Sequence, residues 1–152
     1  MTSMKSLFNH SDVAELLLRV DKLSPDSKRQ WGKMEVAQML AHCNRSLETA
    51  MGKHKIDRVF IGRILAPLLR STVLGPKPFG KNSPTDKSYI FKDQRIFEDE
   101  KAKMKSFIKS FYEGGPAECT THPHPFFGKF TPGEWAIFEW KHLDHHLRQF
   151  AV

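Results

Sequence analysis

The stretch from residue 134 to 150, EWAIFEWKHLDHHLRQF, constrains the fold of this chain most strongly. Its large apolar residues recur every three or four positions, which is the spacing of an amphipathic helix. One stripe of this helix holds Trp135, Phe138, His142, His146 and Gln149. The flank beside it holds Trp140, Leu143, Leu147 and Phe150. The sequence therefore predicts that two histidines lie on the buried side of the helix.

The opposite side of this helix is expected to face water. It carries Lys141, Asp144, His145 and Arg148. The two histidines on the apolar side are four residues apart, so their imidazoles project in the same direction and can bind one ion. Histidine pairs of this spacing also occur by chance, and the alternative is that both rings hydrogen-bond to polar groups of the core.

A second helix, expected over residues 34–51, repeats this pattern. Its apolar arc contains Val36, Met39, Leu40, Cys43, Leu47 and Ala50. A stripe beside the arc has the same spacing as the histidine stripe of the last helix and contains Glu35, Gln38, His42, Ser46 and Thr49. If the two helices pack side by side, His42 meets the histidine pair. The alternative is that this stripe faces water.

Three neutral imidazoles and a water molecule form a site that zinc, nickel or ferrous iron accepts. Such a site leaves one coordination position open for a substrate, whereas a fourth protein ligand would close it. Three further side chains are predicted to orient a substrate or to handle protons beside the site: Glu35, Gln38 and His124. Cys43 adjoins His42 in sequence but points in another direction on the helix, so we expect it to be a small buried hydrophobe.

Other segments are also predicted to be helical, at residues 12–21, 57–74 and 93–112. The 57–74 helix is expected to bury Val59, Phe60, Ile64, Leu68 and Leu69, and Pro67 is expected to kink or divide it. Residues 75–92 are rich in Pro, Gly, Ser and Asn and predict a long loop, which in a compact domain is often functional. Thr131 and Glu134 form a capping-box pattern at the start of the last helix.

No segment predicts a strand, so the fold class is all-α. The simplest arrangement is an antiparallel four-helix bundle with one additional short or broken helix. The 152 residues are expected to form a single domain over residues 1–152. A homodimer is plausible for so small a bundle, although no sequence feature decides it.

The net charge is +7, but the basic residues are dispersed and no nucleic-acid-binding motif accompanies them. We therefore expect no nucleic-acid partner. No window approaches the ~20 apolar residues that span a bilayer, so no membrane partner is expected. The N-terminus lacks a signal-peptide pattern, and Cys43 and Cys119 have no metal or redox spacing. A cytoplasmic location follows.

Four segments resemble an uncharacterised bacterial family within the DinB/YfiT-like metalloenzyme superfamily. They are WGKMEVAQMLAHC at 31–43, KPFGKNSPT at 77–85, HPFFGKFTPGEW at 124–135 and KHLDHHLRQF at 141–150. The resemblance implies an up-down-down-up four-helix bundle. It also implies a divalent metal held by one histidine of the second helix and two of the last, which are His42, His142 and His146 here.

Better-understood relatives in this superfamily are S-transferases that use small thiols such as bacillithiol, mycothiol or glutathione, and a few are isomerases or hydrolases. The resemblance therefore implies a divalent-metal-dependent enzyme that transfers a low-molecular-weight thiol to a small electrophile. Two alternatives stay open. The metal could activate water in a hydrolase, or the bundle could be a non-catalytic ligand-binding or sensor module.

Overall fold

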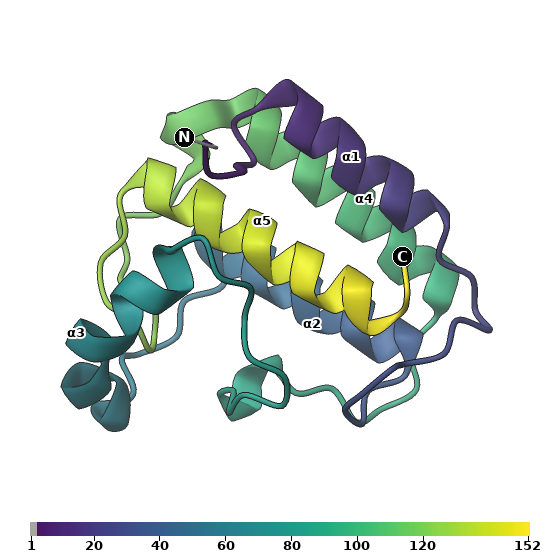
Figure 1. Ribbon diagram of the computed structural model, residues 1–152, viewed down its shortest axis with the longest axis horizontal. Coiled ribbons are helices and arrows are strands. Elements are labelled where there is room, and N and C mark those ends of the chain that lie inside the picture. Colours follow the sequence, from purple (N-terminus) through teal and green to yellow (C-terminus); the bar gives the residue numbers. More distant parts are fainter. Residues whose placement is uncertain (1–2) are drawn as a thin grey trace.

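The computed structural model describes residues 3–152, and all regular structure in this range is helical (Figure 1). The α-helices are α1 (His10–Asp21), α2 (Val36–Ala50), α3 (Phe60–Leu74), α4 (Phe97–Gly114) and α5 (Pro132–Gln149). Two short 3-10 helices are η1 (Lys87–Tyr89) and η2 (Gly115–Glu118). The predicted all-α class is confirmed.

Side chains at the helix starts satisfy backbone N–H groups that the helices leave free. Asn9 caps α1 by accepting from the amides of Ser11 and Asp12. The predicted capping box of Thr131 and Glu134 is present at the start of α5. These local interactions explain why the helix starts were readable from the sequence.

The core lies among α1, α2, α4 and α5. Helix α5 contacts α1, α2 and α3, while α4 contacts α1 and α2. Figure 1 shows α5 running through the middle of the molecule, with α3 at one edge. Helices α1, α2 and α4 each bury an apolar side, and the largest fully enclosed side chains include Leu16, Met39, Phe111, Trp135 and Leu143.

Helix α5 is buried on more sides than its sequence pattern predicts. Lys141 and Asp144 were expected to face water, but each is only 7% exposed. Asp144 accepts from Arg19 of α1 at 2.7 Å. Lys141 Nζ lies 2.6–3.2 Å from three carbonyl oxygens at the end of α3, those of Thr72, Val73 and Gly75. The prediction was wrong because α1 and α3 cover this side and satisfy both charges there.

The other two residues of that side behave differently. Arg148 is exposed, as predicted, and His145 is half-buried. His145 lies between Trp31 and Phe79, with ring centroids 5.5 Å and 6.0 Å away. It is therefore a rim residue beside the histidine pair.

The predicted orientation of α3 was also wrong. Of the side chains expected to be buried, Val59 is half-buried and four are exposed: Phe60 (76%), Ile64 (56%), Leu68 (73%) and Leu69 (38%). The buried residues of α3 are instead the small Gly62 and Ala66. The helix also continues through Pro67 and is not divided there.

Close packing explains why small residues face inward on α3. A Cβ atom added at Gly62 would lie 2.6 Å from the carbonyl oxygen and 2.8 Å from the Cα of Phe126. Only glycine allows the backbone of α3 to come this near to that of residues 125–129. The apolar face of α3 consequently points away from the core.

We expect Gly62→Ala to destabilise the protein by about 1–3 kcal/mol, because the new methyl group would push α3 off the 125–129 loop. Alanine has the higher helix propensity, by about 1 kcal/mol, so any net loss comes from the clash. Urea denaturation monitored by circular dichroism measures the effect. Gly133→Ala is the matched control, since nothing lies within 4 Å of a Cβ there. Equal stability of Gly62→Ala and wild type would contradict the close approach.

Candidate metal centre

Three histidines from two helices converge inside the protein. His42 lies on α2, and His142 and His146 lie on α5; they are 6%, 9% and 8% exposed. The Nε2 atoms of His42 and His142 are 2.9 Å apart. One potential ligand atom from each ring lies within 4.8 Å of the other two. The predicted metal ligands are therefore brought together, and the stripe of α2 does not face water at His42.

The packing of α2 against α5 explains this convergence. Ser46 lies opposite Glu139, just as His42 lies opposite His142, so the two helices run in opposite directions. Because both stripes have the same residue spacing, antiparallel packing keeps them aligned over several turns. The shared spacing seen in the sequence is thus the geometric basis of the cluster.

Hydrogen bonds at the other ring nitrogen orient two of the histidines. His42 Nδ1 is 2.8 Å from the carbonyl oxygen of Tyr89, which can only accept, so Nδ1 carries the proton. His146 Nδ1 is 2.7 Å from Gln149 Oε1. Gln149 Nε2 donates to the Trp31 carbonyl at 2.9 Å, which identifies Oε1 as the acceptor. Both rings therefore direct a lone pair at Nε2 into the cluster.

The third ring is paired with Glu139, a residue that the sequence analysis missed. Glu139 is fully buried, and its Oε2 lies 3.9 Å from His142 Nδ1. This separation is too long for a hydrogen bond, and neither atom has a hydrogen-bond partner in the structure. Ser46 donates to the second carboxyl oxygen at 2.7 Å, yet burial raises the pKa of Glu139 to about 8. A lone carboxylate four residues after Trp135, on the apolar side of the helix, was the signal that could have revealed it.

The cluster fits a divalent transition-metal ion. Burial lowers the pKa of His42, His142 and His146, so all three rings are neutral at pH 7, the form that binds metals. Because Nδ1 of His142 has no hydrogen-bond partner, Nε2–H of His142 can donate across 2.9 Å to the lone pair of His42, and a bound cation would take the place of this proton. Metal–nitrogen bonds of about 2.0–2.1 Å place neighbouring ligand nitrogens roughly 2.9–3.4 Å apart, which matches this separation.

Aromatic rings and the 75–92 loop enclose the cluster. Phe138 stacks against the ring of His142, with centroids 6.0 Å apart and planes at 13°. Phe79 of the loop lies 6.3 Å from the same ring. The loop also supplies the Tyr89 carbonyl that holds His42. These two contacts place the loop beside the histidines, and its functional role stays a prediction.

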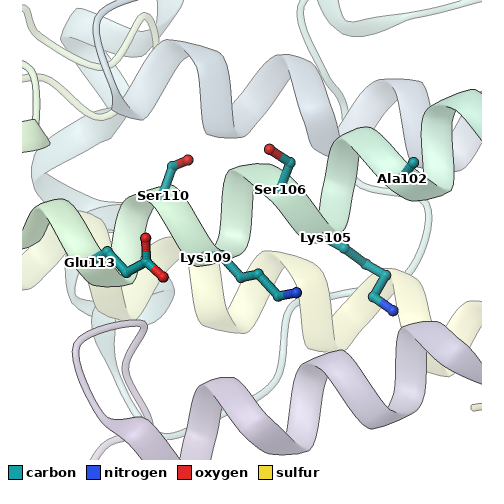
Figure 2. Close-up of a pocket in the computed structure, with 6 residues that line it drawn as sticks. All are labelled: Ala102, Lys105, Ser106, Lys109, Ser110 and Glu113. Atoms are coloured by element: carbon teal, nitrogen blue, oxygen red, sulfur yellow. The ribbon is translucent and has the colours of Figure 1, made fainter.

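Two surface hollows of the protein lie elsewhere. The first, of about 550 Å³, follows one face of α4 and is lined by Ala102, Lys105, Ser106, Lys109, Ser110 and Glu113 (Figure 2). The second, of about 240 Å³, lies at the end of α3 and is lined by Ser71, Thr72, Gly75, Pro76 and Lys77. Neither contains a histidine of the cluster, so neither is the candidate metal site.

The three predicted helper residues occupy different places. Glu35 is exposed and caps α2, where it forms a capping box with Gln38. Gln38 also donates to the carbonyl of Asp93 at 3.2 Å. The contacts of both residues secure the start of α2. Their predicted role in orienting a substrate or handling protons stays a prediction.

His124 is buried among aromatic rings. Its Nδ1 accepts from the amides of Phe126 and Phe127 at 3.0 Å and 3.1 Å. Its ring lies 5.0 Å from that of Phe138, which stacks on the candidate ligand His142. Burial lowers the pKa of His124 to about 3, so this ring stays neutral. A direct role in proton handling is untested.

The fold and this cluster define a class: an all-helical protein with three buried histidines that can hold a metal ion. The chain belongs to the family described as "Protein of unknown function (DUF1569)", whose model matches residues 1–152. Comparisons with curated proteins and with solved structures found no match. Among residues 3–152, no helix has the length and apolar character needed to cross a membrane.

We expect Glu139→Gln to weaken metal affinity by about 10- to 100-fold while preserving the fold. A bound cation would favour the ionised form of Glu139 beside Nδ1 of His142. The amide cannot supply this negative charge, so the ring becomes a poorer ligand. Competition titration with a chromogenic zinc chelator measures the affinity. Ser46→Ala is the control, because it removes a hydrogen bond to Glu139 but leaves a group that can ionise, and its effect should be smaller. Unchanged affinity in Glu139→Gln would contradict this role.

Proposed function

We propose that the protein is a divalent-metal-dependent enzyme, and that a thiol-dependent S-transferase acting on a small electrophile is the function its site supports best. Zinc, nickel and ferrous iron suit the imidazole ligands. One observation carries the proposal: one ring nitrogen each of His42, His142 and His146 lies within 4.8 Å of the other two. No fourth His, Cys, Asp or Glu of residues 3–152 joins them, which leaves room for an exogenous ligand.

We also propose that the fold is the up-down-down-up bundle of the DinB/YfiT-like superfamily, in a single domain. The helix directions follow from residue pairs. Helices α1 and α4 run in opposite directions, since the end of α1 at Asp21 meets Lys101 and Lys105 near the start of α4. Helices α2 and α4 run in the same direction, because Asn44 meets Glu100 and Glu48 meets Lys103. Together with the antiparallel pair α2 and α5, these directions support that topology.

The positive charge of a bound metal ion would activate a thiol. A divalent ion held by neutral imidazoles keeps its positive charge, which lowers the pKa of a bound thiol and favours the thiolate. His42 and His146 would be held in position by the Tyr89 carbonyl and Gln149, and the carboxyl group of Glu139 would lie beside Nδ1 of His142. Phe79 and Phe138 would exclude water from the reacting sulfur. The net charge of +7 favours the approach of an anionic thiol.

Cobalt-substituted protein tests the proposal without knowledge of the electrophile. Adding glutathione should produce a sulfur-to-cobalt charge-transfer band in the near ultraviolet. This band should be absent from His142→Ala. A turnover assay of metal-loaded protein with glutathione and chlorodinitrobenzene follows. Thiol-dependent activity that disappears in His142→Ala supports the transferase.

Other outcomes would contradict this function. Full activity in His142→Ala would show that the cluster does not carry the reaction. Hydrolysis of ester substrates without an added thiol would indicate the metal-dependent hydrolase. Failure of the wild type to bind zinc, nickel or cobalt would indicate a non-catalytic bundle. A small-molecule substrate, the cytoplasmic location and a homodimer remain predictions from the sequence.

A further inference from the structure

Helix α3 concentrates the exposed apolar side chains of the protein. Eight large hydrophobic residues in the described range are exposed, and five of them lie on α3: Phe60, Ile61, Ile64, Leu68 and Leu69. Ile61, Ile64 and Leu68 follow a spacing of three and four residues, so they form one stripe. This stripe, together with Phe60, is called the α3 apolar face below. A contiguous face of this kind marks an interaction surface.

The α3 apolar face is fixed outward by contacts on the other side of the helix. Gly62 packs against the backbone of Phe126, where no larger residue fits. Arg70 donates to the Lys129 carbonyl at 2.8 Å and forms an ion pair with Glu134 at 2.6 Å. Lys141 holds the carbonyls at the C-terminal end of the helix. Because these contacts anchor both ends and the middle, α3 cannot rotate to bury its apolar face.

The same region accounts for most of the net positive charge of the chain. Residues 53–81 contain seven Lys or Arg and one acidic residue, Asp57, and so account for +6 of the net charge of +7. Five of the basic residues are exposed: Lys53, Lys55, Arg63, Lys77 and Lys81. Four of these five flank the two ends of α3, and Arg63 lies on the helix itself. An exposed apolar helix with basic flanks is typical of helices that lie on anionic membranes.

We propose that α3 binds the surface of an anionic lipid bilayer. The α3 apolar face inserts at the boundary of the acyl chains, and the flanking lysines contact headgroup phosphates. Helix α3 has 15 residues and lies at the edge of the molecule, where among the helices it contacts only α5 (Figure 1). It is therefore accessible to a flat surface. The sequence-based expectation of no membrane partner considered spanning segments only, and surface binding is a different association.

Charge favours a bilayer over a second copy of the chain. A symmetric dimer through α3 would place two segments of +6 against each other, and like charges that meet at an interface oppose association. Anionic lipid attracts the same charges, while its acyl chains accept the apolar face. An anionic bilayer thus matches both the basic flanks and the apolar face of α3.

Co-sedimentation with unilamellar vesicles tests the proposal. Vesicles of phosphatidylcholine mixed with phosphatidylglycerol should bind the wild type, and phosphatidylcholine alone should bind it weakly. The double variant Ile64→Ser/Leu68→Ser should reduce the partition coefficient by about tenfold or more, because two inserted side chains are lost. Both residues are exposed, so the fold should survive, and circular dichroism verifies it. Leu18→Ser/Ile96→Ser is the matched control, since these residues are 65% and 67% exposed but lie outside α3.

A charge variant tests the second half of the proposal. Arg63→Glu/Lys77→Glu and added salt should both weaken binding to the anionic vesicles. No binding to these vesicles, or equal binding of wild type and Ile64→Ser/Leu68→Ser, would overturn the proposal. A wild-type dimer that becomes monomeric in Ile64→Ser/Leu68→Ser would assign the face to a second copy and would also overturn it. Metal content should stay unchanged in both variants, which separates this result from the proposed function.

Discussion

His142→Ala is expected to abolish metal binding, the largest single effect that the structure predicts. Purified wild type should carry about one equivalent of a transition metal, because its three imidazoles converge with no competing protein ligand. The variant keeps only His42 and His146, and Glu139 loses the ring that it faces. Ligand that is present at about a thousand times its dissociation constant stabilises a fold by about 4 kcal/mol, and the variant should lose this increment.

Inductively coupled plasma mass spectrometry of untagged protein measures the metal, and thermal unfolding with and without zinc measures the increment. His145→Ala is the control: it removes a neighbouring, half-buried histidine that packs between Trp31 and Phe79. That variant should retain the metal. An equal metal content in His142→Ala and wild type would place the metal elsewhere in the chain.

Acid is expected to destabilise the metal-free protein, and His124 provides the clearest case. Burial lowers the pKa of His124 from 6.5 to about 3. As pH falls below 6.5, the unfolded chain takes up a proton at this residue while the folded protein does not, so unfolding becomes more favourable. Stability that is fully present above pH 6.5 is therefore lost progressively toward pH 3. Each such proton contributes a slope of about 1.4 kcal/mol per pH unit.

Urea denaturation in the presence of a chelator, at several pH values between 7 and 4, measures this slope. His124→Asn keeps an acceptor for the amides of Phe126 and Phe127 but cannot take up the proton. The slope of its unfolding free energy against pH should therefore be smaller by the contribution of about one proton. Phe127→Leu is the control, because it loosens the packing around His124 and keeps the imidazole. Its stability should drop without a change of slope. Identical slopes for His124→Asn and wild type would show that His124 is protonated in the folded state.

The sequence predicted the helices and the clustering of the three candidate metal ligands because both depend on local periodicity. The capping box of Thr131 and Glu134 acts within a few residues, so its effect could be read directly. The histidine stripe of α5 and its counterpart on α2 follow from the angle between successive residues on a helix. Convergence of His42, His142 and His146 then required only that two matching stripes face each other.

The sequence did not reveal which groups hold the histidines in place. Glu139 is a single charged residue in an apolar pattern, and its importance appears only when His142 and Ser46 are seen beside it. Tyr89 acts through its backbone carbonyl, which any residue type could supply, so no sequence signal exists for it. Such contacts join elements that are far apart in the chain.

By itself, then, the sequence determined that the chain is helical and that its histidines occupy apolar sides, since backbone geometry sets the angular position of every residue on a helix. Only the tertiary structure decided what covers each side. Lys141 and Asp144 are buried because α1 and α3 supply partners for their charges. The apolar residues of α3 remain exposed because the close approach at Gly62 turns them outward. Periodicity describes one helix at a time, whereas the burial of a side chain depends on the elements that pack against that helix.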